Sequence, residues 1–474
     1  MKVRLDQIEY VYLIGIGGIG MSALARWFHQ HGRQVAGYDR TCTELTKALE
    51  QEGMQVHYQD DWRLVPEEFK SDKSNVLIIY TPAVPSGHSE LKAFKAQKAL
   101  LMKRSEVLGL LSANYFTIGI AGTHGKTTTT TLVAHVLQCA ALDFTAFLGG
   151  ISANYNSNLL INKPGKADQY MVVEADEFDR SFLRLSPSVE VITSVEADHL
   201  DIYGDEQAVV DAFNAYIAKL KEKDGKLFLQ EKVRLEAARQ LEKSARVATY
   251  GLEQGDCHAA NVRVENGKFV FEIYVKNEQG KDEVWLEGVE MLVPGFHNIE
   301  NALAAVSVAK ALGIPSETVK YALETFKGVK RRFEYIVKNE KHIYIDDYAH
   351  HPTELKVVLE SVKALYANKK LTVVFQPHLF SRTRDFAKEF AQSLSIADQV
   401  VLLPVYPARE LPIEGVNAEM VLEQVNAPDK QLLQDEQLPA WVEHNQPELL
   451  LTVGAGSIDR LVQPIKEVLT VKGR

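Results

Sequence analysis

A lysine followed by a run of threonines stands after a glycine-containing turn at the end of the apolar run 116–121. The segment consists of Gly122, Thr123, His124, Gly125, Lys126, Thr127 and Thr128. In a P-loop, backbone amides surround phosphates, a lysine neutralises the β- and γ-oxygens, and a neighbouring hydroxyl can bind Mg²⁺. The general spacing needs glycine at position 120, where this chain has Ile120, and Gly119 comes one residue too early. Packing alone hardly explains a lysine and threonines at this junction, so the segment predicts a site for nucleotide phosphates.

A second glycine-containing turn lies between the apolar run 11–14 and the helix-like stretch 21–31. It consists of Gly15, Ile16, Gly17, Gly18, Ile19 and Gly20, and Met21 and Ser22 follow it. Glycines permit a tight turn and a close approach of the backbone, so that amides at a helix N-terminus can hold a diphosphate. Asp39 stands at the end of the next predicted strand, 34–38. The pattern fits a dinucleotide site, although any nucleotide diphosphate satisfies the same physics.

Acidic residues follow two further apolar runs, where a metal ion bound to the phosphates would find its ligands. Glu174, Ala175, Asp176 and Glu177 follow the run 171–173, and Glu196, Ala197, Asp198 and His199 follow the run 191–195. Octahedral Mg²⁺ prefers oxygen ligands and keeps several waters. One or two carboxylates with the Thr127 hydroxyl would therefore suffice, and His199 is the less expected ligand.

Two polar segments follow predicted strands in the last third of the chain. The first consists of Asp346, Asp347, Tyr348, Ala349, His350, His351 and Pro352, after the predicted strand 342–345. The second, 376–384, follows the predicted strand 371–375 and contains Arg382 and Arg384. Open α/β sheets bind ligands at the carboxyl ends of their strands, and a guanidinium there can bind a carboxylate or phosphate with two hydrogen bonds. The two segments predict a further polar site.

The elements that must position these residues alternate along the chain. Short runs rich in Val, Ile and Leu alternate with amphipathic stretches, which is typical of βαβ units with buried parallel sheets, so the predicted class is α/β. The chain has 474 residues, and at about 150 residues per domain we expect roughly three domains. We place them at 1–108, 109–327 and 328–474: a Rossmann-like domain, a P-loop ATPase-like domain and a second Rossmann-like domain.

Further elements complete the prediction. Strands are expected over 76–80, 189–193, 399–403 and 449–453, and helices over 299–312, 316–326, 353–366 and 383–394. Between 246 and 293 the apolar period shifts towards 2, and the turn dipeptide Asn266-Gly267 occurs. This region predicts a small antiparallel appendage of the central domain.

Charge and cysteine content exclude several classes of protein. The chain carries 53 Lys+Arg and 63 Asp+Glu, a net charge of −10, so no global basic field attracts nucleic acid or anionic lipid. Its 46% of hydrophobic residues excludes disorder as the main state. Three cysteines, Cys42, Cys139 and Cys257, lie far apart, which argues against a disulfide framework or a zinc site. Without a signal-like segment or an apolar run of about 18 residues, we expect a cytoplasmic protein.

In this order and spacing, the motifs resemble those of the Mur ligases of bacterial cell-wall synthesis. The matching segments are 15–22, 122–128, 174–179, 198–199, 297–301, 331–333, 346–354, 376–385 and 454–457. Within that family, the chain looks most like the members that add L-alanine to UDP-N-acetylmuramate. The resemblance implies a three-domain ligase in which ATP phosphorylates the muramate carboxylate and the amine of L-alanine then attacks the acyl phosphate. The two glycine turns agree with this expectation, one for the UDP-sugar and one for ATP.

The resemblance also implies roles for individual residues. The UDP-sugar would be held by Gly15, Gly17, Gly18, Gly20, Met21 and Ser22, with Asp39 nearby. ATP would contact residues 122–128, with Lys126 at the transferred phosphoryl group, Arg331 at the phosphates, and Asn298 and Asn301 at the adenine. Mg²⁺ would be held by Thr127, Glu174 and His199. Tyr348, His350 and Arg382 would orient the amino acid, and the catalytic residues would be Lys126, His199, Arg331 and His350. Leu379 stands where some relatives carry arginine, and no lysine matches the carbamylated lysine of several sister ligases.

Other functions agree with parts of the pattern. A related recycling ligase joins UDP-N-acetylmuramate to a ready-made tripeptide, but the segments 376–378 and 381–384 resemble the alanine-adding members better. A folylpolyglutamate-type ligase would not need the first glycine turn, and a dehydrogenase would not need the second. A non-catalytic UDP-sugar sensor would not need a phosphoryl-transfer site. We expect ATP and Mg²⁺ as cofactors, UDP-N-acetylmuramate and L-alanine as substrates, a monomer or homodimer, and no nucleic-acid or membrane partner.

Overall fold

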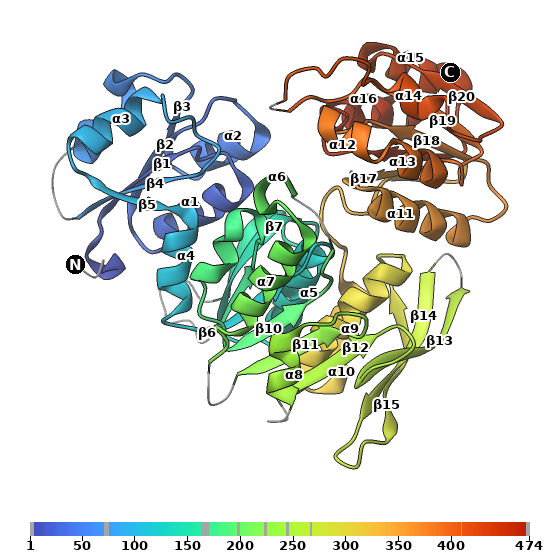
Figure 1. Cartoon of the computed structure of the whole chain (residues 1–474), viewed down its shortest axis with the longest axis horizontal. Helices are drawn as coiled ribbons and strands as arrows, with labels where there is room; N and C mark the ends of the chain where they lie inside the picture. The colour runs from blue at the N-terminus through green and yellow to red at the C-terminus, as the bar shows by residue number, and fades with distance from the viewer. Residues whose placement is uncertain are drawn as a thin grey trace. The chain divides into compact units, whose positions relative to one another are not determined.

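The first sheet has five strands in the order β3-β2-β1-β4-β5, and all neighbouring pairs are parallel (Figure 1). The computed structural model describes residues 4–70, 75–162, 170–196, 200–221, 225–242, 246–265, 268–408 and 410–470. The first block contains β1 (Tyr10–Ile14), α1 (Ile19–Gln30), β2 (Gln34–Tyr38), α2 (Glu44–Gln51), β3 (Gln55–His57), β4 (Val76–Tyr80), α3 (Ser89–Ala96), β5 (Leu100–Lys103) and α4 (Arg104–Ser112). The predicted strands 34–38 and 76–80 are β2 and β4, and the predicted helix 21–31 begins two residues earlier, at Ile19.

The second sheet has ten strands in the order β15-β14-β13-β12-β11-β10-β6-β9-β7-β8. The block contains β6 (Phe116–Ala121), α5 (Lys126–Cys139), β7 (Phe144–Ser152), β8 (Ser157–Ile161), β9 (Tyr170–Glu174), β10 (Val189–Ile192), α6 (Leu200–Tyr203), α7 (Glu206–Ile217), β11 (Lys226–Gln230), α8 (Glu236–Glu242), β12 (Val247–Gly251), β13 (Cys257–Glu265), β14 (Lys268–Lys276), β15 (Asp282–Met291), α9 (Phe296–Ala311) and α10 (Ser316–Thr325).

The region expected to form an antiparallel appendage differs in part from the prediction. Strand β12 pairs in parallel with both β11 and β13, so residues 247–251 belong to the parallel part of the sheet. Strands β13, β14 and β15 stand at one end of the same sheet. The period-2 pattern therefore located the end strands but began one strand too early. Asn266 and Gly267 lie outside the described residues.

The third sheet has six strands in the order β16-β17-β21-β18-β19-β20, with β16 antiparallel to β17. The block contains β16 (Glu334–Lys338), β17 (Ile343–Asp347), α11 (Pro352–Leu365), β18 (Leu371–Phe375), α12 (Phe380–Asp385), α13 (Ala387–Leu394), β19 (Gln399–Leu402), α14 (Glu419–Leu422), β20 (Asp429–Leu432), α15 (Leu438–Asn445), β21 (Leu449–Val453) and α16 (Asp459–Thr470). The single predicted helix 383–394 is two helices, because Phe386 leaves the helical region with φ −121° and ψ 20°. Within the described part of the chain, no helix combines the length and apolar character needed to cross a membrane.

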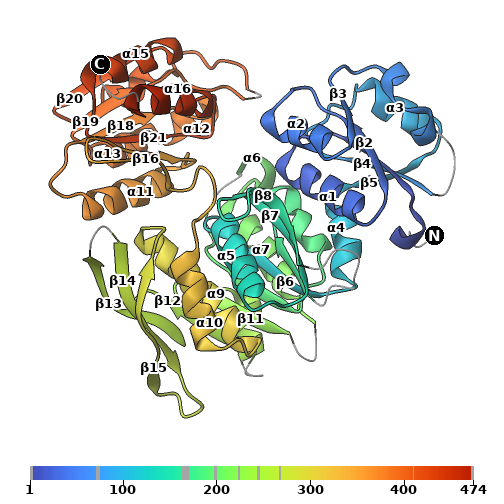
Figure 2. The same cartoon turned by 180° about the vertical axis from the view of Figure 1, so that it is seen from behind.

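The chain divides into two compact units, the first comprising residues 1–258, 274–286 and 301–323, and the second the remainder. Within the first unit, helix α1 packs on the hairpin β7–β8, as Figure 2 shows. The buried Arg26 guanidinium donates to Glu52 Oε1 at 2.6 Å and to Asn158 Oδ1 of β8. The Asn158 amide in turn donates to Ser22 Oγ at 2.8 Å. Polar bonds and a continuous apolar core therefore join the first two sheets.

Gly119, the glycine that comes too early for a P-loop, has a packing role in β6. A Cβ at this position would lie 2.2 Å from the hydroxyl oxygen of Tyr216, a fully buried residue of α7. In the neighbouring strand β10, Glu190 is in register with Gly119 and is itself fully buried. Neither the Glu190 carboxyl oxygens nor the Tyr216 hydroxyl has a hydrogen-bond partner among the described residues. The glycine thus leaves space for a phenol beside a buried carboxyl group.

Candidate active site

The phosphate loop, residues 122–125, joins the end of β6 to the start of α5. Gly122 and Gly125 have φ of 139° and 82°, in the left-handed region that favours glycine. A Cβ would lie 2.0 Å from Thr193 Oγ1 at Gly122 and 2.6 Å from Asn301 Oδ1 at Gly125. The loop therefore needs both glycines, and its backbone leads into the N-terminus of α5, where amides attract anions.

Residues that follow β10 hold the phosphate loop from the side. Ser194 Oγ accepts a hydrogen bond of 2.9 Å from the His124 amide, and Thr193 Oγ1 donates to the His124 carbonyl. The sequence analysis placed Thr193 and Ser194 in the apolar run 191–195 and did not select them as site residues. The signal was available, because β6 and β10 are neighbouring parallel strands whose carboxyl ends meet at one edge of the sheet.

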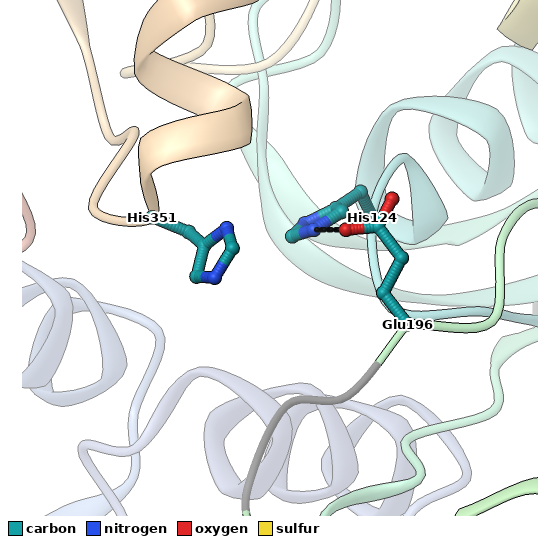
Figure 3. A group of neighbouring side chains, drawn as sticks. All are labelled: His124, Glu196 and His351. Atoms are coloured by element: carbon teal, nitrogen blue, oxygen red, sulfur yellow. Dashed lines mark ion pairs between the residues drawn. The ribbon is translucent and has the colours of Figure 1, made fainter. Parts of the chain in front are cut away.

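An ion pair joins the loop to the same segment. His124 Nε2 lies 3.3 Å from Glu196 Oε2, and Figure 3 shows the two side chains pointing towards each other. The Glu196 amide also donates to Thr123 Oγ1 at 2.9 Å. His351, drawn in the same view, belongs to the second unit, where its side chain accepts a hydrogen bond from the Thr353 amide at the start of α11. Within the first unit, these contacts join the phosphate loop to the segment that follows β10.

The Lys126 ammonium is buried inside the loop. It donates to the Gly122 carbonyl at 2.6 Å, to the Thr123 carbonyl at 3.1 Å and to Glu177 Oε1 at 2.8 Å. Burial lowers the pKa of Lys126, whereas the neighbouring carboxylates, Glu177 and then Glu174, raise it. The carboxylates have the larger combined effect, so the pKa stands above its usual value. Lys126 is therefore a fixed positive charge at the position where the motif predicts phosphates.

Glu174 ends β9, and its carboxylate lies against Gly149 of β7. A Cβ at Gly149 would lie 2.0 Å from Glu174 Oε2, so this glycine leaves the space that the carboxylate occupies. Thr127 is the second residue of α5. His199, the third predicted metal ligand, and Asp198 lie outside the described residues. The predicted ligand set stays a prediction.

The Asp39 carboxylate binds the first glycine turn. The Gly17 amide donates to Asp39 Oδ2 at 2.8 Å, and Gly15 has φ of 88°. Asp39 thus accepts a hydrogen bond from one of the amides that a diphosphate would use. The remaining predicted residues form the N-cap and first turn of α1: Gly18, Gly20, Met21 and Ser22. Arg104, which the sequence analysis did not include, lies against Gly20.

Asn298 and Asn301 lie in the first two turns of α9. The Asn298 side-chain amide donates to the Pro294 carbonyl at 2.7 Å, which fixes the start of the helix. Asn301 Oδ1 accepts a hydrogen bond of 3.0 Å from Thr129 Oγ1, which joins α9 to α5. Asn301 is therefore next to the helix that carries Lys126 and Thr127, while the adenine-binding role of both asparagines stays a prediction.

In the second unit, Arg331 is held by Asp346. Arg331 Nε donates to Asp346 Oδ2 at 3.0 Å, and Nη2 donates to the Gly454 carbonyl at 2.7 Å. The guanidinium carbons of Arg331 and Arg332 lie 5.3 Å and 5.2 Å from the centre of the Tyr348 ring, within cation–π range. The structure therefore brings two predicted residues, Arg331 and Tyr348, together.

His350 lies beside Tyr348, with 5.4 Å between the ring centres. Its amide donates to Glu354 Oε2 at 3.0 Å, and its Nδ1 lies 3.4 Å from the same oxygen. Burial lowers the pKa of His350; Glu354 opposes this shift, whereas Arg382 adds to it. The imidazole is therefore neutral at neutral pH. The sequence analysis included Glu354 only as the end of the matching segment 346–354 and gave it no role, although its spacing from His350 at a predicted helix start was visible.

Backbone strain accompanies two of these segments. Arg331 has φ of 61° and Leu379 has φ of 69°. Residues other than glycine rarely adopt a positive φ, and those that do are concentrated at functional sites. Leu379 directly precedes α12, the short helix that carries Arg382. One residue with positive φ is thus Arg331 itself, and the other lies three residues before Arg382.

Three family models match the chain. The model described as Mur ligase family, catalytic domain, matches residues 10–116, and the Mur ligase middle domain matches residues 120–309. The Mur ligase, glutamate ligase domain, matches residues 331–456. The chain belongs to the Mur ligase family.

Individual members of the Mur ligase family match over nearly the full length. The chain is 48% identical to the UDP-N-acetylmuramate–L-alanine ligase of Cytophaga hutchinsonii, covering 98% of this chain and 97% of the relative. It is 44% identical to the same-named ligase of Christiangramia forsetii, covering 98% of each. The crystal structure of UDP-N-acetylmuramate-alanine ligase from Thermotoga maritima has a TM-score of 0.79 and 27% identity, covering 97% of this chain and 98% of that one. The α/β class and the family resemblance are therefore confirmed.

Proposed function

We propose that this Mur ligase joins L-alanine to the carboxylate of UDP-N-acetylmuramate and converts ATP to ADP and phosphate in doing so. The observation that carries the proposal is the 48% identity, over 98% of the chain, to a relative named for this reaction. The phosphate loop with its charged lysine supports phosphoryl transfer. The group around His350 in the second unit supports the binding of an amino acid. ATP, Mg²⁺ and the two substrates are part of the same proposal.

In the first step, a carboxylate oxygen of UDP-N-acetylmuramate attacks the γ-phosphorus of ATP, which gives an acyl phosphate and releases ADP. Catalysis of phosphoryl transfer is mostly positioning and electrostatic stabilisation. Lys126 suits this task because two carbonyls and Glu177 already fix its ammonium. It would stabilise the charge on the transferred group without a reorganisation of its own.

The residues near the loop fit a divalent cation. The Glu174 carboxylate occupies the space left by Gly149, and Thr127 supplies a hydroxyl at the start of α5. These are oxygen ligands of the kind that Mg²⁺ prefers. When bound there, the ion would neutralise charge on the phosphate oxygens. We include His199 as the third ligand on the basis of the sequence motif.

In the second step, the amine of L-alanine attacks the carbonyl carbon of the acyl phosphate. The tetrahedral intermediate loses phosphate, and the nitrogen loses a proton as the amide forms. The guanidinium of Arg382 suits the amino-acid carboxylate, because it can donate two parallel hydrogen bonds. The neutral imidazole of His350 is available to accept the proton.

The test is phosphate release from ATP and Mg²⁺ in the presence of UDP-N-acetylmuramate. L-alanine is compared with the tripeptide L-Ala-D-Glu-diaminopimelate as the acceptor, and Lys126→Ala is the inactive control. Turnover with L-alanine supports the proposal. Turnover with the tripeptide alone would assign the chain to recycling, and no release with either acceptor would favour a UDP-sugar sensor.

A further inference from the structure

Helix α12, which carries Arg382, begins without a cap of its own. It has six residues, Phe380–Asp385, and an isolated helix of that length is not stable in water. Its N-cap residue, Leu379, makes no side-chain cap hydrogen bond and has φ of 69°. The amides of the first turn therefore need an acceptor from outside the helix.

Glu410, in the segment that follows β19, supplies that acceptor. Its Oε2 accepts a hydrogen bond of 2.9 Å from the Ser381 amide, and its Oε1 accepts one from the Ser381 hydroxyl. Burial raises the pKa of Glu410, but the hydrogen bonds from the side chain and the amide of Ser381 outweigh burial, so the pKa stands below its usual value. The carboxylate is thus ionised at neutral pH, and its charge makes both bonds stronger than bonds to a neutral cap.

Backbone bonds join the same two segments at the start of α12. The Leu379 amide donates to the Tyr406 carbonyl at 2.9 Å, and the Tyr406 amide donates to the Pro377 carbonyl at 2.8 Å. The Leu379 carbonyl accepts from the Thr383 amide at 3.1 Å and from the Thr383 hydroxyl at 2.7 Å. A residue with strained backbone angles persists only where its surroundings fix it. These bonds and Glu410 fix Leu379 and the direction in which α12 leaves it.

Arg382 directly follows the residue that Glu410 holds. Burial lowers the pKa of His350, and the charge of Arg382 lowers it further, so the guanidinium lies within electrostatic range of that imidazole. A guanidinium donates two parallel hydrogen bonds to a carboxylate only when the two groups are aligned. A displacement of about 1 Å in a positioning group can cost about a hundredfold in rate. The orientation of the first turn of α12 therefore decides what Arg382 can bind.

We propose that Glu410 is a positioning residue for the amino-acid substrate, because it fixes the first turn of α12 so that Arg382 can bind the carboxylate of that substrate. The inference rests on the proposed function, since it takes Arg382 to bind the carboxylate of L-alanine. Glu410 acts only through Arg382 and does not touch the substrate. It therefore affects the binding of the amino acid and not that of ATP or UDP-N-acetylmuramate.

The experiment is a double-mutant cycle in which the KM for L-alanine is measured by phosphate release, with ATP, Mg²⁺ and UDP-N-acetylmuramate in excess. We expect Glu410→Ala to raise this KM by roughly tenfold, as for the loss of hydrogen bonds to a charged group, and to leave the KM for ATP unchanged. In combination with Arg382→Lys, the same substitution should raise the KM much less, because the group that needs exact placement is gone. An equal increase in both backgrounds would overturn the inference.

Glu414→Ala is the matched control, since it removes an exposed carboxylate from the same segment and should leave the KM for L-alanine unchanged. Two milder variants test the same contacts if Glu410→Ala does not fold. Ser381→Ala removes the hydroxyl donor but keeps the amide bond, and Glu410→Gln keeps one oxygen acceptor, so each should raise the KM less than Glu410→Ala. An unchanged KM in both would overturn the inference.

The division between kcat and KM separates positioning from a general disturbance of the domain. A lower kcat in Glu410→Ala with an unchanged KM for L-alanine would contradict the positioning role. Failure of the proposed function gives a different result, because the wild type itself would then release no phosphate with L-alanine.

Discussion

Lys126 and Glu177 form an ion pair inside the phosphate loop, with 2.8 Å between Nζ and Oε1. The loop motif predicts Lys126. Glu177 affects the transferred phosphoryl group only by holding Lys126. We expect Glu177→Gln to lower kcat by about tenfold to a hundredfold, because a lysine that is held less firmly misplaces its charge.

The same variant should alter the pH dependence. Glu177 raises the pKa of Lys126 against the effect of burial, so its removal lowers that pKa. Since the lysine acts in its protonated form, the alkaline limb of kcat/KM for ATP should move to lower pH. An alkaline limb at the wild-type position would contradict the assigned role of Glu177.

Gly119→Ala should destabilise the protein, because the added Cβ would lie 2.2 Å from the Tyr216 hydroxyl oxygen. Overpacking of this kind costs about 1–3 kcal/mol. Tyr216→Phe removes that oxygen, and the next atom, Cζ, lies 3.5 Å from the Cβ, an ordinary contact. The double variant should therefore be close in stability to Tyr216→Phe alone. Urea unfolding of the four proteins measures the coupling, and additive effects would disprove the contact.

Glu190 should make the protein less stable as the pH rises. Its burial raises the pKa of the carboxyl group well above its usual value. The unfolded chain releases this proton near its ordinary pKa of about 4.3. The folded chain keeps the proton, so above that pH stability falls by up to about 1.4 kcal/mol per pH unit, until the folded pKa is reached.

Glu190→Gln removes this dependence. The stability of the variant relative to the wild type should therefore be greater at about pH 8 than at about pH 5.5. Urea unfolding at both pH values gives the difference, in which the titration of all other groups cancels. An equal difference at the two pH values would mean that the carboxyl group is ionised in the folded protein.

Arg382→Lys should raise the KM for L-alanine by roughly tenfold, because a point charge replaces a guanidinium that donates two hydrogen bonds. The KM for ATP should change little. Arg384→Ala is the control, since Arg384 is exposed and its Nε donates to the adjacent Asp385 at 2.7 Å. An unchanged KM for L-alanine in Arg382→Lys would remove Arg382 from the amino-acid site.

The strands that the sequence located best are those buried on both faces. The bounds of β18 and β21 agree with the predictions 371–375 and 449–453, and every residue of both strands is buried. The sequence analysis did not predict β16, an antiparallel strand whose apolar run, 335–337, has only three residues and is flanked by Glu334 and Lys338. Helix 383–394 was predicted without its break, since one non-helical residue leaves the apolar pattern intact.

The candidate site was predictable where the backbone itself demands a residue type. Gly122 and Gly125 are examples, because their positive φ favours glycine and a Cβ at either position would clash with a neighbouring side chain. Arg104 was not selected, and Glu177 was selected only as a candidate metal ligand, not as the partner of Lys126. Their contacts, with Asp176 and with Lys126, join segments 72 and 51 residues apart, and a single sequence does not reveal such pairs. The role of His199 stays a prediction.

The bond between Arg26 and Asn158 has a consequence for anyone who divides this chain. The first sheet ends before residue 116, and by strand order alone it could be excised as a fragment. Helix α1, however, buries Arg26 and its apolar neighbours against the hairpin β7–β8 of the next sheet. A fragment cut between the two sheets would expose that face and leave a guanidinium without its amide partner. The smallest autonomous piece of the N-terminal half therefore contains both sheets, and the two should melt in a single cooperative transition.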